Sequence, residues 1–178
     1  MKRAELIAPS SYFHDLATWS RINSVYDQKV ITQVRQVRYE AAEPELFDRL
    51  LRVLDEQRGH TLAIEVEGAK IALSDKKETE IPLEWVKPGL SAEVSRADLV
   101  SHTKQLADRI AARIKICLDQ AGLTASDIEA VFLTGGSVQL AHVRNAIMTS
   151  VPAAQIIEGD TFGAVGKGLT IEAAQRYG

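Results

Sequence analysis

The chain has 178 residues, 46% of them hydrophobic, which is enough to bury a substantial core as one domain or a domain with a subdomain. With 21 basic and 24 acidic residues, the chain lacks the excess of positive charge that is typical of nucleic-acid-binding proteins. No apolar run approaches the ~18 residues of a membrane span. Because the single cysteine, Cys117, excludes an internal disulfide and no signal segment is evident, we expect a cytoplasmic protein.

Residues 1–42 are predicted to form an irregular arm followed by a helix. The arm contains Pro9 and a pair of serines, and its large apolar side chains recur at roughly helical spacing and are expected to anchor it on a core. These side chains are Tyr12, Phe13, Leu16 and Trp19. From Ser24 to Tyr39 the apolar spacing predicts an amphipathic helix.

Residues 43–122 are predicted to form a small lobe of two helices, a hairpin and a long helix. Pro44 marks a helix start, and a break at Gly59 separates this helix from a second one that ends near Ser74. Alternating apolar and polar residues around Pro88-Gly89 predict a hairpin over 78–94.

The longest predicted helix begins at Ser95 and ends at a Gly122 cap. Its apolar residues recur at spacings of three, four and seven, and they include Cys117, which we therefore expect to pack in the core. Scattered histidines with no metal-ligand spacing give no candidate metal site.

Residues 123–178 are predicted to be an α/β segment. A capping box or a turn over Thr124–Asp127 precedes a strand at 131–133, and then come a helix over 139–150, a strand at 155–157 and a last helix over 161–176. The glycines and lysine of 159–168 do not fit a Walker A loop, which requires glycine at Thr161 and Ser or Thr at Gly168.

The most informative motif is the turn Gly135-Gly136-Ser137, directly after the strand 131–133. Without Cβ atoms, the two glycines let a ligand approach the main chain, and Ser137 is predicted to cap the helix that follows. The N–H groups at such a helix start favour anionic or polar ligand groups. A tight strand-to-helix connection with no ligand is the alternative interpretation.

Ordered motifs along the chain resemble the actin-like ATPase domain of Hsp70-type chaperones, and most of all its YegD-like branch. Glu67-Gly-Ala-Lys70-Ile-Ala-Leu-Ser74 is similar to the family's "E-x-A-K-x-x-L-S" helix, and Val131-Phe-Leu-Thr-Gly-Gly-Ser137 to its "VLVGGS" adenosine motif. The segment 163–169 is similar to the helix that closes the fold, and 95–99 to the start of a long helix.

The resemblance implies an α/β fold with an α+β lobe inserted, namely the C-terminal half of an actin-like, ribonuclease H-like ATPase. We therefore expect a truncated chain that lacks the loops holding phosphates and magnesium, binds ATP or ADP weakly or not at all, and has no catalytic residue of its own. Magnesium would bind only in the intact protein.

By resemblance, Glu67 and Lys70 reach the ribose hydroxyls, Ser74 reaches the adenine edge, and the backbone of 135–137 approaches ribose and α-phosphate. Glu67, Lys70 and Ser74 share one helix face by spacing, and a surface Glu–Lys pair is the alternative interpretation.

Two departures from the family weaken this site. Ile71 and Gln139 stand where Hsp70 proteins have arginines that stack on adenine, so guanidinium stacking is lost on both sides. Asp160 and Phe162 lie near the place of a family aspartate close to the ribose.

Three functions are compatible with the sequence. The chain is expected to be the adenine-nucleotide-binding half of an Hsp70-like ATPase, with a co-chaperone or client protein as further partners. The alternatives are a non-catalytic protein-interaction lobe and part of another actin-like kinase.

Overall fold

The computed structural model describes residues 10–159 and 163–177. Packing divides the chain into two compact units, residues 1–95 and 96–178, which are described separately. The division predicted from the sequence, at 42/43 and 122/123, stays a prediction.

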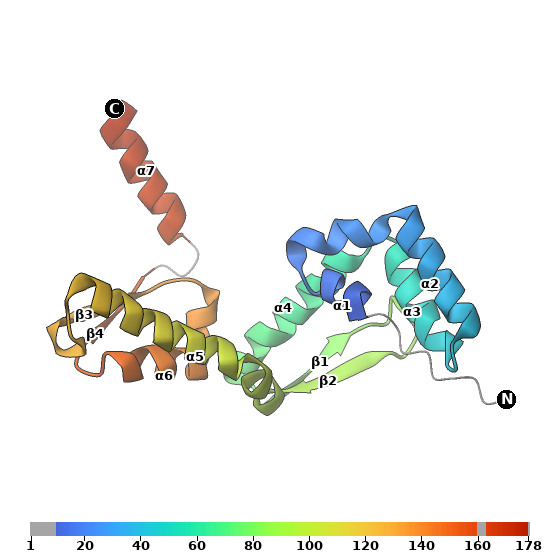
Figure 1. The fold of residues 1–178 in the computed structure, drawn as a ribbon, viewed down its shortest axis with the longest axis horizontal. Helices are drawn as coiled ribbons and strands as arrows, with labels where there is room; N and C mark the ends of the chain where they lie inside the picture. The colour runs from blue at the N-terminus through green and yellow to red at the C-terminus, as the bar shows by residue number, and fades with distance from the viewer. Residues whose placement is uncertain (1–9, 160–162, 178) are drawn as a thin grey trace. The chain divides into compact units, whose positions relative to one another are not determined.

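The first unit is a set of helices followed by a hairpin (Figure 1). Its elements in chain order are α1 (Ser10–Leu16), the 3-10 helix η1 (Trp19–Tyr26), α2 (Gln28–Glu40), α3 (Pro44–Asp55), α4 (Gly59–Asp75), β1 (Glu78–Pro82) and β2 (Ser91–Ser95).

Local sequence explains where these helices begin and end. Asp27 caps α2, because its carboxylate accepts a hydrogen bond of 2.8 Å from the backbone N–H of Lys29. Pro44 occupies the first turn of α3, where its missing N–H costs nothing. The positive φ of Gln57, 53°, reverses the chain between α3 and α4. The predicted helix pair and the break between its members are confirmed.

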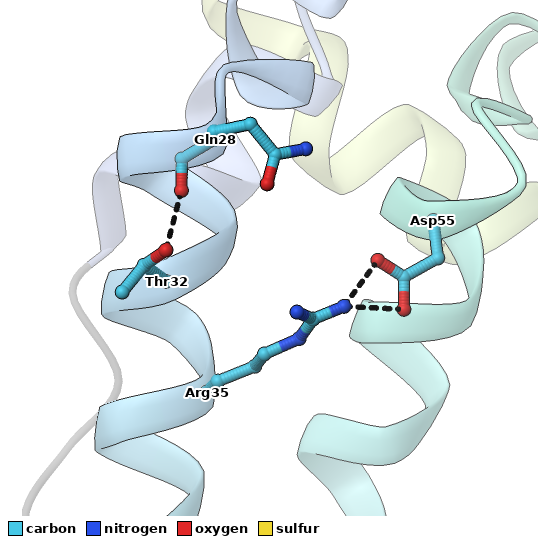
Figure 2. Close-up of polar contacts among 4 residues, drawn as sticks. All are labelled: Gln28, Thr32, Arg35 and Asp55. Atoms are coloured by element: carbon cyan, nitrogen blue, oxygen red, sulfur yellow. Dashed lines mark hydrogen bonds and ion pairs between the residues drawn. The ribbon is translucent and has the colours of Figure 1, made fainter.

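The core of the first unit lies where α1, η1, α2 and α3 meet. The largest fully buried side chains come from three of these helices: Ile22 and Val25 from η1, Val34 from α2 and Leu54 from α3. At the rim, Arg35 of α2 donates to both carboxylate oxygens of Asp55 of α3, at 3.0 and 3.3 Å (Figure 2). Figure 2 also shows Thr32, whose hydroxyl donates to the carbonyl of Gln28 at 2.7 Å. Both side chains of the ion pair are about half exposed, so burial of apolar surface is the dominant stabilising term.

The N-terminal arm differs from its prediction. Within the described residues, 10–26 are almost wholly helical, and Leu16 is buried as expected. Phe13 and Trp19, however, are 51% and 60% exposed, so they are not core anchors. Helical spacing among apolar residues does not tell whether a neighbouring element covers them.

The predicted hairpin is confirmed. β1 and β2 pair antiparallel, with Glu78 opposite Ser95 and Pro82 opposite Ser91. The connection contains Gly89 at φ 72°, a left-handed conformation that favours glycine. α4 packs against β1, so the hairpin continues directly from the helix that carries the first motif.

The second unit is a two-stranded parallel sheet with helices (Figure 1). Its elements are α5 (Arg96–Ala121), the 3-10 helix η2 (Ala125–Asp127), β3 (Ala130–Leu133), the 3-10 helix η3 (Gly136–Gln139), α6 (Ala141–Ser150), β4 (Gln155–Glu158) and α7 (Ala164–Tyr177). Gly122 has φ 65°, as a glycine cap requires.

The core of this unit joins α5, β3 and α6. Its buried members are Ala107, Leu133, Leu140, Val143 and Ile147. In α5 only Ala107 is buried among the described residues, and Cys117 is exposed, so the prediction of a core cysteine is wrong. The apolar stripe exists, but Cys117 lines an open groove of about 650 Å³ within this unit instead of a packed interface.

The predicted capping box at Thr124–Asp127 is present. The backbone N–H and the hydroxyl of Thr124 both donate to the Asp127 carboxylate at 2.7 Å. These bonds, the side-chain one first, lower the pKa of Asp127 from its ordinary value.

The lowered pKa sets the sign of a pH effect. Because the folded-state pKa is depressed, the box stabilises the unit fully above the ordinary aspartate pKa of about 3.9, and this contribution is lost as pH falls through the folded value. We expect a carboxyl titration by NMR to give Asp127 a lower pKa than that of aspartates whose carboxylates accept no hydrogen bond. Thr124→Ala should move it back toward the ordinary value, and an unchanged titration in that variant would contradict the assignment.

No helix within the described residues is long and apolar enough to cross a membrane.

Candidate functional site

The turn after β3 is an open backbone bend. Gly135 has φ 89°, and among the described residues no heavy atom other than those of its own chain neighbours lies within 4 Å of the place where a Cβ would stand. A side chain there would be strained because of the dihedral, yet the space beside it is empty. The bend is therefore bare main chain with room for a ligand group.

Neighbouring elements hold the bend in place. The backbone N–H of Gly159, just after β4, donates to the carbonyl of Leu133 at 3.0 Å, which extends the parallel pairing to the end of β3. Between α5 and α6, Thr103 Oγ1 lies 2.8 Å from His142 Nε2, and Arg144 of α6 pairs with Glu158 of β4 at 2.5 Å.

The predicted cap by Ser137 is wrong. Ser137 lies inside η3, and α6 begins only at Ala141, with Leu140 at the N-cap position and no side-chain cap. The backbone N–H of Leu140 donates to the carbonyl of Ser137 at 3.2 Å, which closes the 3-10 turn. The bend thus leads into a tight turn first, and Ser137 is left exposed beside Gly135 and Gly136.

The second group of candidate residues lies on α4. Glu67 and Lys70 form an ion pair of 2.6 Å, with side chains 54% and 27% exposed. Ser74, half-buried, lies one turn further along the same helix face. The structure therefore brings Glu67 and Lys70 together as an accessible acceptor and donor.

The positions of the missing arginines are exposed. Ile71 is 57% exposed on α4, and Gln139 is exposed in η3. The two candidate groups belong to different units, so a joint site of α4 and the bend stays a prediction. Asp160 and Phe162 lie outside the described residues.

Sequence reasoning missed a groove beside Glu67. Within the first unit, α1, η1 and α4 border an open groove of about 710 Å³, which is lined by Phe13, Trp19 and Glu67 together with aliphatic side chains. The spacing of the aromatic residues in 12–19 is the sequence signal for this groove, but the same spacing equally predicts packing in a core. Among the described residues, no cluster of three or more His, Cys, Asp or Glu is arranged to hold a metal ion.

Comparison with known proteins identifies the family. The model of the family described as "Hsp70 protein" matches residues 38–175. Two similar relatives are the proteins named "Chaperone protein DnaK" of Halobacterium salinarum strains R1 and NRC-1, each 35% identical over 96 residues, or 51% of this chain. The match covers 15% of the length of these relatives. Since the family model spans more than half of the chain and includes both motif segments, the chain belongs to the Hsp70 family.

Proposed function

We propose that this chain is an adenine-nucleotide-binding part of an Hsp70-like chaperone ATPase, on the YegD-like branch of the family. ADP or ATP would lie between the α4 row (Glu67, Lys70 and Ser74) and the bend at 135–137. The single cysteine suits a reducing compartment, and we place the protein in the cytoplasm.

The observation that carries the proposal is the bare bend at Gly135. Its positive φ and the empty space where a Cβ would lie allow a ribose or phosphate to approach the main chain. A connection selected only for packing would not need an uncovered backbone.

The α4 row suits the hydroxyl groups of a ribose. A hydroxyl both donates and accepts, and the Glu67–Lys70 pair offers a carboxylate acceptor and an ammonium donor 2.6 Å apart. Both side chains remain accessible, so a nucleoside can replace part of their hydration. Magnesium would accompany the phosphates in the intact protein, and we propose no hydrolysis by the described residues.

Calorimetry with ADP tests the proposal. We expect weak binding by the full chain, and we expect Lys70→Ala to weaken it by about tenfold or more, as the loss of one charged hydrogen bond predicts. Lys104→Ala is the matched control, because Lys104 pairs with Asp108 in a similar exposed pair at 2.7 Å on α5. If calorimetry detects no heat of binding at millimolar ADP, the proposal is overturned. Equal losses of ADP affinity in the two variants would overturn it as well.

A protein-contact role is the second candidate. Ile64 and Ile71 lie seven residues apart on one face of α4 and are 60% and 57% exposed, and exposed apolar side chains on one helix face are typical of contact sites for a co-chaperone or client. A chain with this role alone would bind no nucleotide, so the same calorimetry separates the two candidates.

A further inference from the structure

The groove of the first unit has the size and lining of a small-molecule site. Its volume of about 710 Å³ falls in the range of ligand pockets, roughly 300–1,000 Å³, which are mostly apolar with a few polar groups. Here the single charged lining residue is Glu67. All of the lining comes from α1, the connection to η1, η1 itself and α4, so the groove is complete within one unit.

The groove continues the row of candidate residues on α4. Ala63 lines it and stands four residues before Glu67, while Lys70 and Ser74 follow at three and seven residues. Residues at these spacings lie on one face of a helix. A ligand whose hydroxyls meet Glu67 and Lys70 therefore has the groove at one end and Ser74 at the other.

Two aromatic side chains of the groove are available for stacking. Trp19 is 60% exposed and Phe13 is 51% exposed, although both line the groove. The Trp19 ring is held by an edge-to-face contact with the His60 ring, with centroids 4.6 Å apart and planes at 80°. An exposed but oriented indole is a suitable platform for a nucleobase, since every base has a π-face.

We propose that this groove receives the purine base in this chain, with Trp19 and Phe13 as stacking surfaces and Glu67 at the ribose. The inference rests on the proposed function and adds the position of the base. Ile71 and Gln139 offer no guanidinium for stacking, whereas aromatic surface lies beside the same ribose-binding pair. The base thus points toward the N-terminal half of α4, and Ser74 is not its main contact.

Fluorescence of Trp19 tests the position of the base directly. The chain has two tryptophans, so a Trp85→Phe background leaves Trp19 as the only reporter and keeps an aromatic ring under Arg58, which lies 4.1 Å from the Trp85 ring centroid. We expect saturable quenching by adenosine and none by ribose 5-phosphate. Quenching by an apolar peptide but not by adenosine would overturn the proposal in favour of a protein-contact groove.

Calorimetry with ADP provides the second measurement, on single variants that keep Trp85. Trp19→Ala should raise the dissociation constant about tenfold, and Trp19→Phe should restore most of the affinity. Tyr39→Ala removes another exposed aromatic ring, on α2 and outside the groove lining, and should change nothing.

The outcomes separate this inference from the proposed function. If Lys70→Ala weakens ADP binding and Trp19→Ala does not, the base lies elsewhere and only the inference fails. If the unmodified chain binds no ADP, the proposed function fails and the inference fails with it.

Discussion

Leu54→Ala is expected to lower the free energy of unfolding of the first unit by about 2–5 kcal/mol, the largest effect that we predict for a single substitution. Leu54 lies on α3 with none of its surface exposed, in the cluster that includes Val34 of α2. Truncation removes apolar contacts and leaves a cavity that a helix cluster fills only partly. The loss is a large fraction of the ~5–15 kcal/mol by which small domains are stable.

Urea denaturation followed by tryptophan fluorescence measures this effect selectively. Both tryptophans, Trp19 and Trp85, belong to the first unit, so the signal reports that unit alone. The matched control is Leu46→Ala on the same helix. Leu46 is 48% exposed, so its truncation should lower the free energy of unfolding far less. Equal shifts of the two midpoints would contradict the core as described.

Gly59→Ala is expected to destabilise the same unit by about 1–3 kcal/mol through overpacking. A Cβ at Gly59 would stand 2.6 Å from Ile22 Cγ2 and 2.8 Å from the Tyr26 hydroxyl, both closer than van der Waals contact allows. Ile22 is fully buried and has no room to move away. The backbone N–H of Gly59 also donates to that hydroxyl at 2.9 Å, so displacement of Tyr26 would break the bond.

Gly68→Ala provides the opposite result on the same helix. Among the described residues nothing outside the helix's own backbone lies within 4 Å of a Cβ at Gly68, and alanine is the better helix former. This variant should therefore raise the free energy of unfolding by about 0.5–1 kcal/mol. Thermal melting of Gly59→Ala, Gly68→Ala and the unmodified chain tests both expectations by comparing their melting temperatures. A higher melting temperature for Gly59→Ala would show that α4 does not pack on η1 as described.

The order of elements was largely predictable because local chemistry defines it. Pro44 at a helix start, Gly89 in the hairpin connection and Gly122 after the long helix each act through backbone conformation, which is readable from the residue itself. The 3-10 turn at 136–139 escaped prediction, because the choice between an immediate helix and one further turn depends on packing of Leu140 into the core.

Exposure was less predictable than secondary structure. The apolar spacing in α5 and in residues 12–19 is real, yet Cys117 and Trp19 are exposed, because spacing identifies a helix face without identifying what covers it. The same limit applies to the candidate site. Helical spacing places Glu67 beside Lys70, whereas their pairing with the bend at Gly135 depends on how two units meet.

The most direct test of nucleotide binding at both groups of residues is an NMR titration of the nitrogen-15-labelled chain with ADP. We expect the amide signals of Gly135, Gly136 and Ser137 to shift together with those of 67–74, all with one dissociation constant. Shifts confined to one of the two groups, or no shifts at millimolar ADP, would contradict it.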